Sequence, residues 1–110
     1  MIRSFQPGEI RIDAASHAQA VILSATTLGT DPTLRSVADL GAAQVERLLA
    51  LAPEVVLLGS GVRQVFPPAA FSARFLTAGI GFEVMDTGAA CRTFNVLVSE
   101  QRKVAAVLIP

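Results

Sequence analysis

Three short strand-like segments, separated by segments with helical periodicity, constrain the fold of this chain more than any other feature. They are residues 55–58 and 104–109, which are apolar throughout, and residues 81–85 between them. Apolar runs of four to six residues are typical of strands that are covered on both faces. Because helical segments separate them, the order strand, helix, strand, helix, strand predicts a mostly parallel sheet covered by helices, an α/β fold.

Periodicity and proline or glycine positions predict the first two helices. The first follows Asp39 and ends at Pro53, because proline cannot continue the hydrogen-bond ladder. The second begins near Pro67 and Pro68, and Gly79 supplies a left-handed cap at its end. The expected apolar faces are Val45, Leu48, Leu49 and Ala52 in the first helix, and Phe71, Phe75 and Ala78 in the second.

The first 39 residues predict a β-hairpin followed by a loop. Residues 9–13 alternate between polar and apolar, and residues 17–25 begin alternating and end as an apolar run, so two strands joined by a short turn are expected. Residues 26–39 are rich in Thr, Gly, Asp and Pro and predict a loop with a brief extended piece at 34–37. Loops of this length are often functional.

Composition indicates a single globular domain spanning residues 1–110. Hydrophobic residues make up 52% of the chain and charged residues 16%, which is too apolar for disorder, and no apolar run is long enough to span a membrane. Nine basic and nine acidic residues give a net charge of zero. Such a chain has no field to attract nucleic acid, and its weak charge repulsion leaves room for self-association or a protein partner.

One cysteine and one histidine exclude an internal disulfide and leave almost no ligands for a zinc site. We therefore expect no metal and no cofactor. Residues 1–10 lack the apolar core and cleavage signal of a secretory peptide, so a reducing, cytoplasmic location is expected.

The helix expected over residues 87–102, which Asp86 or Thr87 can cap, carries the candidate nucleophile. Cys91 lies in its first turn, where the positive end of the helix dipole would favour a thiolate. The alternative, which we favour, is that Cys91 is a small buried hydrophobic residue. The only histidine, His17, lies in the early hairpin and is expected to be a surface or edge-strand residue.

The same helix also carries a polar stripe that could bind an anion. Two arginines with an asparagine between them can hold a carboxylate or phosphate, and a glycine-containing turn after a buried strand offers backbone amides nearby. The candidate ligand-binding residues are Gly59, Ser60, Gly61, Arg63, Arg92, Thr93, Asn95 and Arg102. The alternatives are a solvated helix face whose arginines form ordinary surface ion pairs, and a tight turn without a ligand.

Several motifs resemble one family of small domains. Gly59–Gly61 stands where the family has Gly-Thr-Gly, Arg92–Asn95 where it has Arg-Thr-Tyr-Asn, and Glu100–Arg102 where it has Glu-Gly-Arg. The likeness covers most of the chain and is most specific in its second half. This family includes the mitochondrial complex I assembly factor 3 and an adipogenesis-associated cytosolic protein. Phe94 replaces the family's tyrosine and removes its hydroxyl group.

The resemblance implies a three-layer fold, with a hairpin and helix on one side of a mixed central sheet and helices on the other. One strand would then run antiparallel, which modifies the mostly parallel sheet predicted above. For activity it implies little, since the bacterial members have no established reaction and the mitochondrial relative is a chaperone-like assembly factor.

Two functional hypotheses follow. The favoured one is a non-catalytic interaction or assembly-factor-like module that binds a protein partner or a second copy of itself. The alternative is a binder of a small anionic ligand, or a weak enzyme, that uses the Gly59–Gly61 turn and the start of the helix at Arg92–Asn95.

Overall fold

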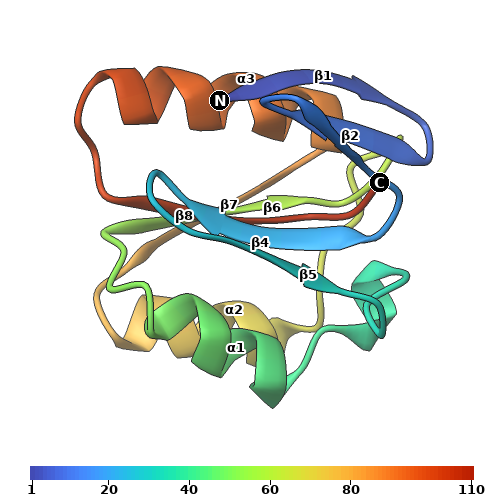
Figure 1. Ribbon diagram of the computed structural model, residues 1–110. Helices are drawn as coiled ribbons and strands as arrows, with labels where there is room; N and C mark the ends of the chain where they lie inside the picture. The colour runs from blue at the N-terminus through green and yellow to red at the C-terminus, as the bar shows by residue number, and fades with distance from the viewer.

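The centre of the molecule is a five-stranded mixed sheet, in a computed structural model that describes residues 1–110 (Figure 1). The strand order is β5-β4-β8-β6-β7. Strand β6 is parallel to β7 and β8, whereas β4 is antiparallel to both of its neighbours, β8 and β5. Only β4 therefore runs against the other strands, which confirms the mixed sheet and its one reversed strand. The elements are β1 (Ile2–Gln6), β2 (Glu9–Ile12), β3 (Ala15–His17), β4 (Ala20–Ser24), β5 (Leu28–Asp31), the 3₁₀ helix η1 (Val37–Asp39), α1 (Ala42–Leu49), β6 (Val55–Gly59), α2 (Ala69–Thr77), β7 (Gly81–Met85), α3 (Thr87–Ser99) and β8 (Val104–Leu108).

Two apolar layers cover the two faces of this sheet, which confirms the three-layer α/β fold (Figure 1). Helices α1 and α2 cover one face, and α3 together with the antiparallel sheet β1-β2-β3 covers the other. Side chains of β6 alternate between the layers, with Val56 and Leu58 on the α1–α2 side and Val55 and Leu57 on the α3 side. Strand β6 is therefore apolar at every position because both of its faces are covered.

The amino-terminal region contains more strands than the sequence predicted. Residues 2–6 form β1, which was not predicted, because a register shift between Ile2 and Ser4 breaks its alternation. Residues 17–25 do not form one strand. The chain turns at the exposed residues 18–19, so β3 ends in the small sheet and β4 begins in the central one.

The predicted loop over residues 26–39 contains regular structure. Strand β5 lies at the edge of the central sheet and has only one buried residue, Asp31, so it carries no apolar pattern. The extended piece expected at 34–37 is wrong. Leu34, Val37 and Leu40 are instead buried at three-residue spacing around η1, as a helical turn requires.

The helices lie where the sequence placed them, with shorter ends. Helix α1 ends at Leu49, before Pro53, and Ala52 is exposed instead of lying on the apolar face. Helix α3 ends at Ser99, because Gln101 adopts a left-handed backbone with φ of 61°. Arg102 therefore lies outside the helix on which it was expected.

Asp86 is the residue that caps α3, since its Oδ1 accepts a hydrogen bond of 2.9 Å from the Ala89 amide. At the end of α2, Gly79 has φ of 76°, the left-handed conformation expected of it, whereas Ala78 is exposed and leaves Phe71 and Phe75 as the buried face.

None of the helices has both the length and the apolar character needed to cross a membrane.

Candidate functional site

The Gly59–Gly61 turn is joined to the start of α3 by a buried threonine. Thr87 is fully buried, and its Oγ1 accepts a hydrogen bond of 2.8 Å from the Gly61 amide and donates one of 2.6 Å to the Ile109 carbonyl. The Thr87 amide also donates to the Gly61 carbonyl at 2.8 Å. One side chain therefore connects the ends of β6 and β8 to α3.

Close packing explains the first glycine of this turn. A Cβ atom on Gly59 would lie 2.9 Å from Leu108 Cδ2, 3.0 Å from Thr87 Oγ1 and 3.1 Å from Ala90 Cβ. Glycine at this position lets α3 lie directly against β6. At the other end of the turn, Gly61 has φ of 107°, which residues with side chains rarely adopt.

Ser60 organises the loop that follows, residues 60–68. Its Oγ donates to the Arg63 carbonyl at 2.6 Å and accepts from the Val65 amide at 2.9 Å. Its backbone amide donates to the Met85 carbonyl at 2.9 Å. The backbone amides of Ser60 and Gly61 both donate to acceptors within the protein, so neither is free to bind an anion. Anion binding by this turn stays a prediction.

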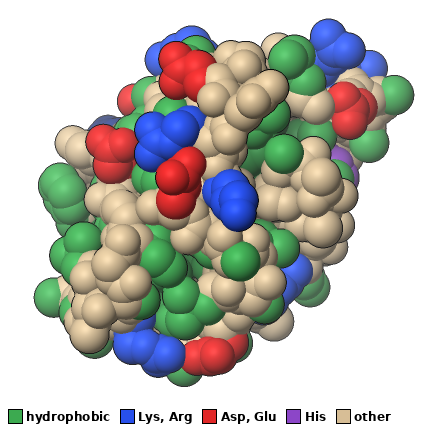
Figure 2. Space-filling model, turned by 90° about the vertical axis from the view of Figure 1, so that its left-hand side faces the viewer, with side chains coloured by type: hydrophobic (Ala, Val, Ile, Leu, Met, Phe, Trp, Pro, Cys, Tyr) green, Lys and Arg blue, Asp and Glu red, His purple; other side chains and the backbone are tan.

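The remaining candidates lie in three different places. Arg63 is exposed in the loop after the turn. Arg102 pairs with Glu54 at 2.7 Å, and these residues precede β8 and β6, so they lie at the opposite end of the parallel strands from the glycine turn. On that end of the molecule, acidic and basic side chains are interspersed (Figure 2). Arg102 therefore forms a surface ion pair, as the alternative interpretation expected.

Asn95 holds β1 on α3. Its Oδ1 accepts a hydrogen bond of 3.1 Å from the Ile2 amide, and its Nδ2 donates one of 2.7 Å to the Ile2 carbonyl. Arg92 and Asn95 both line a cavity between α3 and β1, and Arg92 is exposed. Thr93 is half-buried, and its hydroxyl makes no hydrogen bond. The structure thus brings Arg92 and Asn95 together, away from Arg102.

Cys91 is buried against the central sheet, in the way that the favoured interpretation expected. Burial raises the pKa of its thiol to about 11, because the thiolate would lose its hydration, and the nearby Arg92 charge only partly opposes this. The thiol is therefore protonated at neutral pH, and the helix dipole does not make it a nucleophile. His17 lies in β3, an edge strand, as expected, and its Nε2 is buried without a hydrogen-bond partner.

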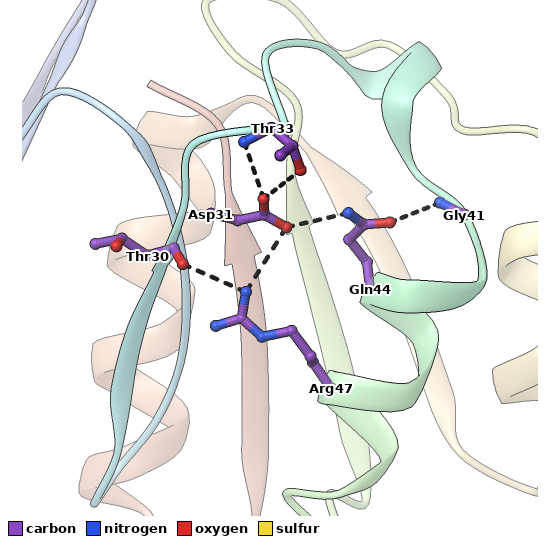
Figure 3. Close-up of polar contacts among 6 residues, drawn as sticks. All are labelled: Thr30, Asp31, Thr33, Gly41, Gln44 and Arg47. Carbon is purple, nitrogen blue, oxygen red and sulfur yellow. Dashed lines mark hydrogen bonds and ion pairs between the residues drawn. The ribbon is translucent and has the colours of Figure 1, made fainter.

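A buried polar cluster that the sequence did not predict connects β5 to α1 (Figure 3). The carboxylate of Asp31 accepts hydrogen bonds from the Thr33 hydroxyl at 2.6 Å and from Gln44 Nε2 at 3.0 Å. Gln44 Oε1 in turn accepts from the Gly41 amide at 2.9 Å, and Arg47 lies 3.7 Å from Asp31. Both carboxylate oxygens are engaged within the protein, so the cluster serves to hold α1 and β5 together.

This cluster predicts an acid-sensitive contribution to stability. The Thr33 hydroxyl above all, with Gln44, holds the pKa of Asp31 below its usual value, although burial opposes them. A lowered pKa in the folded state contributes stability above the unfolded pKa, and this stability is lost as the pH falls through the folded value. We expect Asp31→Asn to reduce the loss of stability between about pH 5 and pH 2, in urea unfolding series.

Glu83→Gln is the matched control, since Glu83 is exposed and its side chain makes no hydrogen bond. This variant should lose stability with falling pH as the wild type does. If the free energy of unfolding of Asp31→Asn fell with pH as steeply as that of the wild type, this account would be contradicted.

The chain is similar to proteins that are named in three different ways. A family model described as "Protein of unknown function (DUF498/DUF598)" matches residues 2–109. An uncharacterised protein of Rhodobacter capsulatus is 32% identical over 109 residues, which cover 99% of this chain and 83% of that protein. The 13 kDa major membrane protein of Francisella tularensis is 28% identical over 108 residues, covering 97% and 88%. The NADH dehydrogenase (ubiquinone) 1 alpha subcomplex assembly factor 3 of Danio rerio is 47% identical over 57 residues, covering 52% of this chain and 33% of that protein.

Solved structures share the whole fold. A protein of Xanthomonas campestris, solved by NMR, has a TM-score of 0.89 and 38% identity, with 99% of this chain and 83% of that chain covered. A crystal structure described as an outer membrane protein from Bartonella henselae has a TM-score of 0.87 and 30% identity, with 98% and 92% covered.

Proposed function

The chain belongs to the DUF498/DUF598 family, as its motifs indicated, and from this premise we propose that it is a non-catalytic module that binds another protein, in the manner of an assembly factor. Two similar proteins are named NADH dehydrogenase (ubiquinone) 1 alpha subcomplex assembly factor 3, and assembling a larger complex requires contacts between proteins. The remaining support comes from the surface of this chain.

The loop of residues 60–68 carries the proposal. Val62, Val65 and Phe66 have 65%, 48% and 69% of their surfaces exposed. Apolar residues that are exposed singly are common, but three within five residues of one loop offer apolar surface of the kind that protein partners cover. Burying the part of each side chain that is still exposed contributes on the order of 1–2 kcal/mol.

The loop is also held in place before any partner binds. Ser60 donates and accepts hydrogen bonds within it, and Gln64 Nε2 donates to the Val84 carbonyl at 2.9 Å, which fastens the loop to β7. A loop that is already ordered loses little conformational entropy on binding. These contacts favour a docking surface over a mobile connection.

The test is a pull-down from extract of the native organism with tagged wild-type protein and Phe66→Asp. We expect wild type to recover a stoichiometric partner, and Phe66→Asp to recover about tenfold less of it, because a buried carboxylate opposes an apolar interface. Leu76→Asp is the matched control, since Leu76 is 60% exposed on α2, outside the loop. It is expected to retain the partner.

The same extract tests the location and the alternative partner. We propose a cytoplasmic protein, so the tagged chain should remain in the high-speed supernatant; recovery in the membrane pellet would contradict this.

If the partner is a second copy, purified wild type sediments as a dimer and Phe66→Asp as a monomer. Wild type that recovers no stoichiometric protein and remains strictly monomeric would refute the interaction module.

A further inference from the structure

We propose that the cavity between β1 and the first half of α3 binds a small organic carboxylate. Its volume is about 340 Å³, and its walls come from opposite ends of the chain, because β1 lies along α3 (Figure 1). Arg3, Ser4 and Phe5 contribute from β1, and Gly88 and Arg92 contribute from α3. This site lies outside the loop of residues 60–68, and it does not use the glycine turn.

The two arginines of this cavity form no ion pair, since neither Arg3 nor Arg92 has a carboxylate oxygen within 4.0 Å. The nearest negative charges are Asp13, whose pKa is lowered mainly by the amino terminus and in part by Arg3, and Asp86, which borders the cavity beside Arg92. Two guanidinium groups that line the same cavity attract an anion and offer it several N–H donors. A carboxylate bound there could accept hydrogen bonds from both groups.

One backbone amide at the cavity is also free. In the first turn of α3, the amides of Thr87, Ala89 and Ala90 donate to Gly61, to the Asp86 side chain and to the Asp86 carbonyl. The Gly88 amide has no acceptor in the protein. Because Asp86 already offsets part of the helix dipole, the guanidinium groups provide the main attraction and the Gly88 amide one additional donor.

The side chains around Gly88 indicate the shape of the ligand. A Cβ atom on Gly88 would lie 3.3 Å from Asp86 Oδ1, 3.5 Å from Phe5 Cδ2 and 3.6 Å from Arg92 Nη1. The Asp86 carboxylate, which caps α3, therefore borders this point on one side, and an aromatic edge and a guanidinium group border it on the others. Ile2 and Cys91 add apolar surface. A carboxylate with a small apolar body, such as a ring, fits this combination better than a bare inorganic anion.

The other cavity beside α3 lacks this chemistry. It has a volume of about 280 Å³ and lies between the second half of the helix and the turn that joins β4 to β5. Its walls include Asp13, Phe94 and several serines and threonines, but no arginine. Anion binding is therefore assigned to the cavity at Arg3 and Arg92.

Benzoate and benzamide test the proposal, because they share a ring and differ in the negative charge. We expect benzoate to cause saturable shifts of the Ser4, Gly88 and Arg92 resonances in ¹⁵N-correlated NMR spectra at constant ionic strength, and benzamide to bind about tenfold more weakly. Acetate, which has the charge without the ring, should also bind more weakly than benzoate.

Arginine variants identify the charges involved. Arg3→Gln and Arg92→Gln should each weaken benzoate binding about fivefold, whereas Arg35→Gln, which removes an exposed arginine outside the cavity, should leave it unchanged. All three positions are exposed, so the spectra should show folded proteins.

The proposal fails if benzoate causes no saturable shifts, if benzamide binds equally well, or if Arg3→Gln and Arg92→Gln both bind like wild type. Because the cavity shares no residue with the loop of residues 60–68, its failure leaves the pull-down result unaffected, and the reverse also holds.

Discussion

Replacing Thr87 by valine is expected to lower the free energy of unfolding by about 3 kcal/mol. Valine has nearly the same shape as threonine but removes the hydroxyl, so the buried Gly61 amide loses its acceptor and the Ile109 carbonyl loses its donor. Each orphaned group costs about 1–3 kcal/mol when water cannot replace the lost partner. The change should appear as a lower urea midpoint with an unaltered slope.

Two further variants separate the hydroxyl from the methyl group. Thr87→Ser keeps both hydrogen bonds and should cost only about 1 kcal/mol for the lost methyl. Thr93→Val removes a half-buried hydroxyl on the same helix that makes no hydrogen bond, and it should change little. If Thr87→Val were as stable as Thr93→Val, Thr87 would not be the junction that we describe.

Replacing Phe75 by alanine is expected to cost about 4 kcal/mol. Phe75 is fully buried on α2, its ring stacks on Phe82 with centroids 5.4 Å apart, and it meets the edge of Phe71 at 5.2 Å. Alanine removes both aromatic contacts and leaves a cavity between α2 and the sheet, because the helix and strands relax only partly.

The adjacent residue provides the control for this prediction. Leu76 is 60% exposed, and Leu76→Ala should change the free energy of unfolding by less than about 0.5 kcal/mol in the same urea titrations. Equal losses for the two variants would mean that α2 is not packed on the sheet through Phe75.

The second half of the fold could be predicted from the sequence because its signals are local. In β6 every position is apolar, and in α2 Phe71 and Phe75 share one face, so both elements lie close to their expected bounds. The first half was harder. Strand β5 is an edge strand with one buried residue, and β1 contains a register shift, so neither shows the alternation from which strands are recognised.

The roles of individual polar residues were harder to predict from the sequence than the elements, because they depend on contacts between distant parts of the chain. The structural importance of Gly59 and Gly61 was visible as a turn after a buried strand. Nothing local indicates that Asn95 binds the backbone of Ile2, 93 positions away, or that Asp31 accepts from Gln44. Thr87 was considered only as a cap, because a hydroxyl that bridges two distant backbone groups leaves no trace in spacing.

The position of β8 determines when this fold can form during synthesis. Strand β8 lies between β4 and β6, and residues 21–24 pair with residues 105–108 of it. The ribosome therefore releases β4 and its other neighbour, β5, long before β8 exists, and β1 waits in the same way for α3. Contacts so distant in sequence close slowly, so the apolar residues of β4 that face β8 and α3 stay uncovered until those elements have been synthesised.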